Sequence, residues 1–265
     1  MKVSKLIVNC LALAALAVGV TACGKGNADK EGKSDVNTNL SFESFQFDYV
    51  AQADTTDSVE GAKFIHLKSE GVLPRDLGSA NIKTLRDSLL AMSGVTFTGE
   101  DSVDPKLPEG YSLTDAMPDS VDSCDEDYSR ISLALVNPRI AVFEVSVYDY
   151  PYHAAHGMTT ESYLNYDLTA GRILGLQDLL VKGYEKKLAE LVRADVKAMN
   201  VSLLGNLSDM QPSAQFAMTS NGLMFSYNPY EIAPYSEGVV KVEVSLDQLV
   251  EANLLSPLGK SLFNL

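Results

Sequence analysis

Two histidines lie three positions apart in the segment His153-Ala-Ala-His156. On a helix, this spacing would place both imidazoles on one face, where they could hold a metal ion with Asp149 or Glu161 as a third ligand. The segment instead follows Pro151 between two predicted strands, and no glutamate separates the histidines as it does in zinc hydrolases. The sequence therefore favours a structural role for His156, with its ring bonding loop carbonyls, and we predict no metal and no cofactor.

A second candidate is the segment 227–238, which carries three tyrosines, two prolines and a glutamate. The prolines make this loop stiff because each fixes its own φ. One interpretation is that Tyr227, Tyr230 and Tyr235 close the end of a sheet and bond the loop backbone through their hydroxyls. The other is that they form the rim of a binding site, since stiff aromatic loops bind at low entropic cost. Glu231 is expected to accept bonds from loop amides. The candidate binding residues are Tyr227, Tyr230, Glu231, Tyr235 and His156.

The other reactive side chains form no recognisable catalytic motif. Cys124 lies among acidic residues, and neighbouring carboxylates raise the pKa of a thiol and disfavour its reactive thiolate. The sequence has no glycine-rich phosphate loop, no Gly-x-Ser-x-Gly elbow and no dinucleotide fingerprint. An enzyme acting on envelope glycan would have to use His153 and His156, so we predict no catalytic residue and lean towards a function that is not enzymatic.

The strands that flank the tyrosine–proline segment are predicted by alternation. Apolar residues alternate along 214–219 and along 223–228, and the pair Asn221-Gly222 between them is typical of a type I′ hairpin turn. The second strand must end near Pro229, which has no amide hydrogen to donate. Alternating valines over 240–244 predict a third strand.

The remaining elements give the fold class. Alternation predicts further strands near 42–49, 64–67, 131–135, 141–147 and 164–168. Helical spacing of apolar residues predicts a helix from Ser79 to Gly94, a longer helix from about residue 184 and a short helix over 246–252. Because strands adjoin in runs and helices are separate, the class is α+β: an antiparallel sheet with helices packed on one face, built as a small N-terminal β-β-α half and a larger C-terminal half.

The first 22 residues are typical of a secretory signal peptide. Lys2 and Lys5 precede an apolar run over 6–20, which is too short for a stable membrane span. The sequence Val20-Thr-Ala-Cys23 resembles a bacterial lipobox, which predicts cleavage before Cys23 and attachment of fatty acids to that residue. We therefore predict a lipid-anchored protein of the cell envelope, on the periplasmic face of the inner or outer membrane, with exposure at the cell surface left open.

These features divide the chain into five segments. They are a lipoprotein signal peptide (1–22), a flexible tether (23–39), an N-terminal β-β-α subdomain (40–98), an acidic loop (99–126) and a C-terminal domain (127–265). The tether and the acidic loop are poor in apolar residues and rich in polar ones, a composition that favours flexible chain.

The formal net charge of −14 narrows the choice of partners. Nucleic acid and anionic lipid carry the same sign and are poor partners. A basic protein or a cationic ligand would be attracted, and a solvated acidic surface would also keep the protein soluble. The expected partners are the membrane, through the N-terminal lipid, and a protein or glycan of the envelope.

Three sequence motifs resemble one family. They are Tyr227-Asn-Pro-Tyr-Glu-Ile-Ala-Pro-Tyr followed by Gly238, Ala155-His-Gly, and Tyr163-Leu-Asn-Tyr-Asp-Leu followed by Gly171. Together they resemble the signature of a family of extracytoplasmic domains of unknown function, named after the anti-sigma-V factor (RsiV) of Gram-positive bacteria and common in Bacteroidetes lipoproteins. The resemblance covers roughly residues 125–250.

The resemblance implies a binding or sensor-like function. The namesake's extracellular domain binds lysozyme, which implies a lipid-anchored domain that recognises a protein or glycan at the envelope. The namesake's cytoplasmic sigma-binding part has no counterpart here, since about five residues precede the apolar run, so we expect no anti-sigma activity. Two alternatives remain open: an envelope glycan hydrolase or deacetylase-associated module using His153 and His156, and a purely structural envelope lipoprotein.

Overall fold

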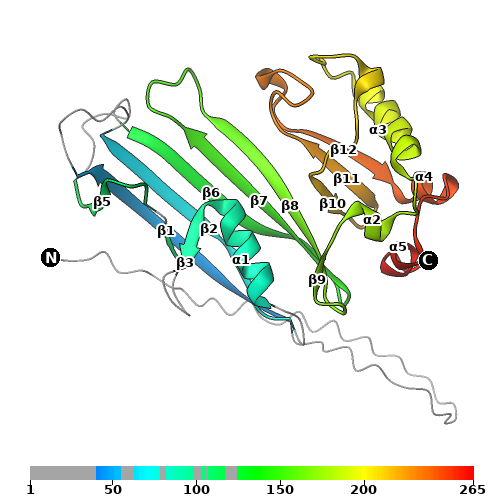
Figure 1. Ribbon diagram of the computed structural model, residues 1–265, viewed down its shortest axis with the longest axis horizontal. Coiled ribbons are helices and arrows are strands. Elements are labelled where there is room, and N and C mark those ends of the chain that lie inside the picture. Colours follow the sequence, from blue (N-terminus) through cyan, green and yellow to red (C-terminus); the bar gives the residue numbers. More distant parts are fainter. Residues whose placement is uncertain (1–39, 55–62, 78–81, 98–102, 106, 117–123) are drawn as a thin grey trace, which may run out of the picture.

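The protein is described from a computed structural model, which describes residues 40–54, 63–77, 82–97, 103–105, 107–116 and 124–265 (Figure 1). The predicted signal peptide, the tether and Cys23 lie outside these residues, as do parts of the acidic loop. The predicted α+β class is confirmed, because a large, mostly antiparallel sheet carries few helices. None of the helices that the structure describes has the length and hydropathy of a membrane span.

The described strands include a seven-stranded sheet in the order β5-β1-β2-β6-β7-β8-β9. Its strands are β1 (Ser41–Ala53), β2 (Phe64–Asp76), β5 (Tyr111–Thr114), β6 (Cys124–Val136), β7 (Ile140–Tyr150), β8 (Met158–Asp167) and β9 (Arg172–Leu174). Neighbouring strands are antiparallel except β2 and β6, which are parallel. Since a hairpin cannot join parallel strands, the chain between β2 and β6 crosses over through α1 (Ile82–Ser93), the pair β3 (Val95–Phe97) and β4 (Val103–Pro105), and β5.

Helix α1 covers one face of this sheet (Figure 1). Leu85 and Leu89, one turn apart, are fully buried and share a hydrophobic cluster with Ile131 of β6. Gly94 follows the helix with φ +74°, the left-handed conformation that ends many helices. The predicted helix and its end at Gly94 are confirmed, and its predicted cap, Ser79, lies outside the described residues.

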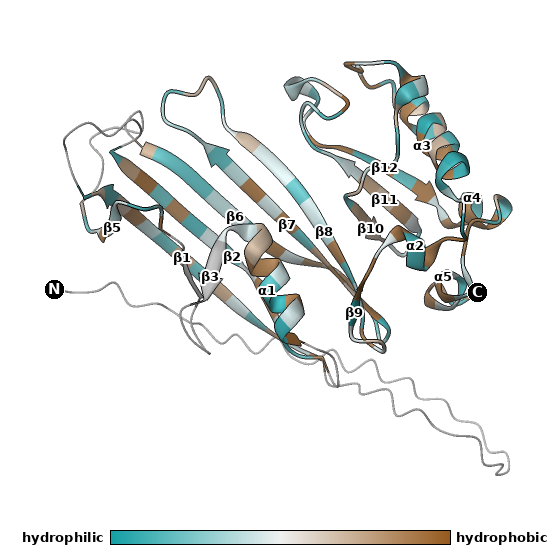
Figure 2. Ribbon diagram, in the orientation of Figure 1, coloured by the Kyte–Doolittle hydropathy of each residue, from teal (hydrophilic) through white to brown (hydrophobic). Residues whose placement is uncertain are grey.

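Side chains of the large sheet alternate between its two faces. Figure 2 shows the resulting hydrophobic and hydrophilic bands along β1 and β2. Phe47 and Leu67 belong to the hydrophobic cluster beneath α1. Their neighbours Asp48 and His66 therefore lie on the opposite face, which carries polar and aromatic side chains.

The C-terminal part forms a second sheet, whereas the sequence had predicted one sheet. Its strands β10 (Phe216–Met218), β11 (Gly222–Tyr227) and β12 (Val240–Ser245) lie in the order β10-β11-β12 (Figure 1). Around it lie α2 (Leu176–Leu179), α3 (Glu185–Met199), α4 (Leu246–Glu251) and α5 (Pro257–Leu262), with short 3₁₀ turns η2 (Leu207–Asp209) and η3 (Tyr235–Glu237). Leu188, Val192 and Val196 of α3 pack in one hydrophobic cluster with the strand residues of this small sheet.

The predicted hairpin is confirmed, but its predicted turn is wrong. The amide of Thr219 donates to the carbonyl of Gly222 at 3.0 Å, so the turn is centred on Ser220 and Asn221, and Asn221 lacks the positive φ of a type I′ turn. Gly222 is instead the first residue of β11. A Cβ atom there would lie 2.2 Å from the carbonyl oxygen of Val244, so the close approach of β12 requires glycine.

Side-chain amides join the two sheets. The buried Asn165 of β8 donates from Nδ2 to the carbonyl of Phe216 at 2.8 Å and accepts from the amide of Met218 at 2.6 Å. Asn228, just after β11, accepts from the amide of Glu161 at 2.7 Å and donates to its carbonyl at 3.2 Å. These paired bonds use the backbone groups that a neighbouring strand would otherwise bond, which is why the small sheet lies beside β8 without extending the large one.

A charged network reinforces the same junction. Lys241 of β12 places Nζ 2.7 Å from Glu161 and 3.7 Å from Glu144. The hydroxyl of Tyr163 donates to Glu161 at 2.5 Å and lies 3.1 Å from Glu144. Burial and the two carboxylates raise the pKa of Tyr163 well above its ordinary value, so the phenol remains a proton donor at neutral pH.

Replacing Asn165 tests the amide junction. Phe216 and Met218 direct their backbone groups away from β11, because the hairpin bonds are made by the alternate residues 215, 219, 222 and 226. Asn165→Ala therefore leaves a buried donor and a buried acceptor without partners, and we expect the free energy of unfolding to fall by about 2–5 kcal/mol. Urea unfolding followed by circular dichroism measures this loss.

The matched control is Asn206→Ala, which removes an exposed amide that bonds Asp209. We expect a change within about 0.5 kcal/mol for this variant. Equal stability of the Asn165→Ala and Asn206→Ala variants would contradict a supporting role for the junction.

Candidate functional site

The structure brings together three of the sequence-predicted residues. The ring of His156, in the loop between β7 and β8, stacks on the ring of Tyr235 with centroids 3.8 Å apart. The ring of Tyr230 lies 6.2 Å from that of Tyr235 and 6.5 Å from that of His156. Tyr230 is 50% exposed and Tyr235 37% exposed. We call these three residues the aromatic cluster.

The hydrogen bonds of His156 fix its protonation pattern. Its Nδ1 atom lies 3.0 Å from the carbonyl oxygen of Gly157, which can only accept, so Nδ1 carries a proton. In the neutral ring, Nε2 is then free to accept from the hydroxyl of Tyr230, 3.3 Å away. The bond to a loop carbonyl is the one expected from the sequence. It also orients the ring for stacking.

Gly157 is required by close packing. A Cβ atom at this position would lie 2.3 Å from the hydroxyl oxygen of Tyr148. The glycine therefore lets the Tyr148 ring of β7 lie against the loop that carries His156. This contact explains why glycine follows His156 in the sequence.

The tyrosine–proline loop is held by its own backbone. Tyr230 has φ +70°, and its amide donates to the carbonyl of Ala233 at 2.9 Å. The carboxylate of Glu231 accepts from the amide of Asn228 at 3.1 Å, which is the loop-bonding role expected of it. Because Asn228 also bonds the backbone of Glu161 on β8, the loop is fastened to the large sheet immediately before Tyr230.

Tyr227 does not join the cluster. It is 3% exposed, and its hydroxyl donates to the carbonyl of Gln211 at 2.8 Å and accepts from the amide of Ser213 at 3.2 Å. Burial raises its pKa far above the ordinary value. The structure thus places Tyr227 in the core, where it closes the end of the small sheet and bonds the neighbouring backbone, and leaves Tyr230 and Tyr235 exposed.

Sequence reasoning missed an aromatic row that continues from the cluster across the large sheet. Tyr148 stacks on Tyr128 of β6 at 5.7 Å, and Tyr128 meets the edge of His66 of β2 at 5.3 Å. The hydroxyl of Tyr128 lies 3.1 Å from Nδ1 of His66, whose Nε2 lies 2.6 Å from Asp48. Strand alternation could have placed each residue on the polar face, but their adjacency depends on the register of three strands.

The second histidine of the sequence motif stays apart from the cluster. His153 is exposed, adopts φ +61° and packs against the ring of Tyr152 at 3.8 Å. Within the described ranges, no group of three histidine, cysteine or acidic side chains is placed to hold a metal ion. Cys124 is buried, and burial is the largest cause of its raised pKa, ahead of the neighbouring carboxylates.

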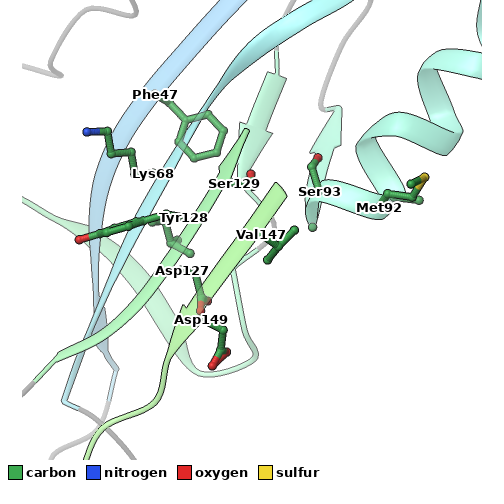
Figure 3. Close-up of a pocket in the computed structure, with 12 residues that line it drawn as sticks. Phe47, Lys68, Met92, Ser93, Asp127, Tyr128, Ser129, Val147 and Asp149 are labelled. Carbon is green, nitrogen blue, oxygen red and sulfur yellow. The ribbon is translucent and has the colours of Figure 1, made fainter. Parts of the chain in front are cut away.

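A cavity of about 310 Å³ lies on the other face of the large sheet, at the C-terminal end of α1 (Figure 3). Its lining residues come from β1, β2, β6, β7 and the end of α1: Phe47, Leu67, Lys68, Ala91, Met92, Ser93, Gly94, Asp127, Tyr128, Ser129, Val147 and Asp149.

Two of these lining residues, Asp127 and Asp149, are directly opposite each other in the β6–β7 register. Burial, then the charges of Asp149 and Asp125, raise the pKa of Asp127 to about 6. Burial and Asp125 also raise the pKa of Asp149.

The raised pKa of Asp127 predicts a pH-dependent stability. A carboxyl whose pKa is about 6 in the folded protein, against about 3.9 in the unfolded chain, stabilises the fold when protonated. That contribution is present below the unfolded value and is lost as pH rises towards the folded value. Because Asp127 is only partly buried, we expect a loss on the order of 1 kcal/mol between about pH 4 and pH 7.

Asp127→Asn removes this titration. We expect the variant to unfold at a higher urea concentration than the wild type at pH 8 and to match it more closely near pH 4. Glu251→Gln, on the exposed surface of α4, serves as the control and should follow the wild-type profile. An Asp127→Asn profile parallel to the wild type would show that this carboxyl does not titrate as described.

The fold and part of the sequence match known proteins. Residues 177–247 match the model of DUF3298, a protein family of unknown function, and this stretch includes the tyrosine–proline loop but not His156. Two solved structures share the fold. A DUF3298 family protein from Pseudomonas aeruginosa PAO1 is 18% identical, with a TM-score of 0.57 over 84% of this chain and 97% of that chain. A member of the same family from Bacteroides fragilis NCTC 9343 is 19% identical, with a TM-score of 0.58 over 82% and 94%. No curated protein matches the chain.

Proposed function

We propose that this protein is a lipid-anchored binding module of the bacterial cell envelope, and that its partner is a basic protein that contacts the aromatic cluster. The observation that carries the proposal is the exposure of Tyr230 and Tyr235 from a loop that Asn228 fastens to β8. Within the loop, the amide of Tyr230 also donates to the carbonyl of Ala233. An exposed tyrosine in a rigid loop loses little conformational freedom when a partner binds, and tyrosine is enriched at protein interfaces. The match to DUF3298 over this loop supports an RsiV-like relationship, which is part of the proposal.

The charge of the protein suits a basic partner. The net charge of −14 attracts a cationic protein at long range and raises the rate of encounter, while the aromatic contacts decide affinity at short range. Steering of this kind weakens as salt increases, whereas stacking and burial of aromatic rings do not. The two contributions can therefore be separated by varying ionic strength.

The strand order supports presentation of the cluster away from a membrane. β1 begins at Ser41, beside the end of β2, whereas the loop that carries His156 follows Tyr150 at the other end of the sheet. If fatty acids on Cys23 hold the N-terminus at a bilayer, the cluster lies at the far end of the large sheet. This arrangement would leave the cluster accessible to soluble proteins.

Lysozyme is the first probe, because it is basic and because the family resemblance implies it. We expect binding in about 0.15 M salt, and an affinity about tenfold lower for Tyr230→Ala and for Tyr235→Ala. Val250→Ala removes an apolar side chain that is 44% exposed on α4 and should bind as the wild type does. Isothermal titration calorimetry measures each affinity.

Three outcomes would contradict the proposal in different ways. Absence of lysozyme binding at both low and physiological salt would exclude this partner. Equal affinity of the wild type, Tyr230→Ala and Tyr235→Ala would show that the partner binds elsewhere. Binding of a neutral glycan in place of a basic protein would also overturn the stated partner class.

The lipid anchor has its own test. Metabolic labelling with a palmitate analogue should mark the wild type and Cys124→Ser, and Cys23→Ser should carry no label and leave the membrane fraction. Cys124 is buried, so its replacement controls for general effects of losing a thiol. Label retained by the Cys23→Ser variant would place the modification at another residue.

A further inference from the structure

The cavity beneath the end of α1 combines an apolar wall with a charged end. Phe47 and Leu67 are almost fully buried and belong to the main hydrophobic cluster, and Val147 packs against that cluster. Asp127 and Asp149 stand at the other end of the lining (Figure 3). Apolar walls with a few converging polar groups are the usual composition of a small-molecule site, and about 310 Å³ is near the lower limit of such sites.

The negative charge of this cavity is not neutralised within the described part of the chain. No ion pair there involves Asp127 or Asp149. Lys68 contributes to the lining, but Figure 3 shows its amino group on the side away from both carboxylates, as strand alternation requires. Asp125, on the same face, adds a third carboxylate, which accepts a bond from the amide of Tyr152.

We propose that this cavity binds a small primary amine that carries a short apolar chain. The ammonium group lies between Asp127 and Asp149, and the chain lies along Phe47, Leu67 and Val147. Directly opposed residues of antiparallel strands have Cβ atoms about 5 Å apart, so a single ammonium can bond both carboxylates. A purely apolar ligand would leave the two charges facing each other, and a compact metal ion would leave the apolar wall unused.

The proposed site has a built-in pH dependence. An ammonium is held most strongly when both carboxylates are ionised, and the groups that face them from the packed elements are Asp125, Ser129 and Ser93. Burial raises the pKa of Asp127 to about 6, so affinity should increase as pH rises from about 5 to about 7. Asp127 and Asp149 lie on the opposite face of the sheet from the rings of the aromatic row, and Tyr128 belongs both to that row and to the cavity lining.

Binding of n-hexylamine, followed by two-dimensional ¹⁵N NMR of the folded protein, tests the proposal. We expect saturable shifts at pH 7.5 in the amides of the lining strands, with n-hexanol, the uncharged counterpart, at least about tenfold weaker. Asp127→Asn and Asp149→Asn should each weaken hexylamine binding by about tenfold or more, and Glu251→Gln should leave it unchanged. Hexylamine affinity should fall at pH 5.

The alternatives give different results. Equal binding of hexylamine and hexanol would show an apolar cavity without a charge requirement and would overturn the proposal. Shifts produced by calcium ions but not by hexylamine would replace it with a metal site. Hexylamine binding that is unchanged in both aspartate variants, or absent from the wild type, would also overturn it.

Discussion

Side-chain amides between β8 and the small sheet are the interactions on which the rest of this structure depends. Asn165 bonds the outward-facing backbone of β10, and Asn228 bonds the backbone of Glu161 with both its donor and its acceptor. Buried backbone groups without partners are costly, so each pair of bonds fixes where the small sheet can lie. Lys241 adds charge between the same elements. The fold therefore has two sheets in contact and no continuous hydrogen-bond ladder between them.

This junction also assembles the candidate binding surface. His156 belongs to a loop of the large sheet, whereas Tyr230 and Tyr235 belong to a loop of the small sheet. Their rings meet because Asn228, two residues before Tyr230, is fixed to β8. The aromatic row through Tyr148 then continues the surface over the large sheet, so a partner would meet one surface built from both parts.

The sequence was informative wherever one face of an element is buried. The stripe of Leu85 and Leu89 predicted α1, and alternating valines predicted β12. When one face of an element is buried, its apolar residues recur with the spacing of a helix or of a strand. The stiffness of the tyrosine–proline loop could be predicted from its two prolines. Local signals of this kind need no knowledge of distant partners.

The features that the sequence did not reveal depend on contacts between distant residues. The separate small sheet follows from the bonds that Asn165 and Asn228 make with residues more than 50 positions away. The hairpin turn was misplaced because glycine at position 222 is required by the close approach of Val244 from β12, and not by a turn conformation. The opposed pair of Asp127 and Asp149 depends on the register of β6 against β7, which alternation alone does not set.

The central claim is that Asn228 holds the aromatic cluster together across the two sheets. The most direct test is the NMR signal of the His156 ring protons in the wild type and in Asn228→Ala, because stacking on Tyr235 shifts these protons by the ring current. We predict that the shift is present in the wild type and is lost in Asn228→Ala while the core methyl signals stay in place. An unchanged His156 signal in a folded Asn228→Ala variant would contradict the account.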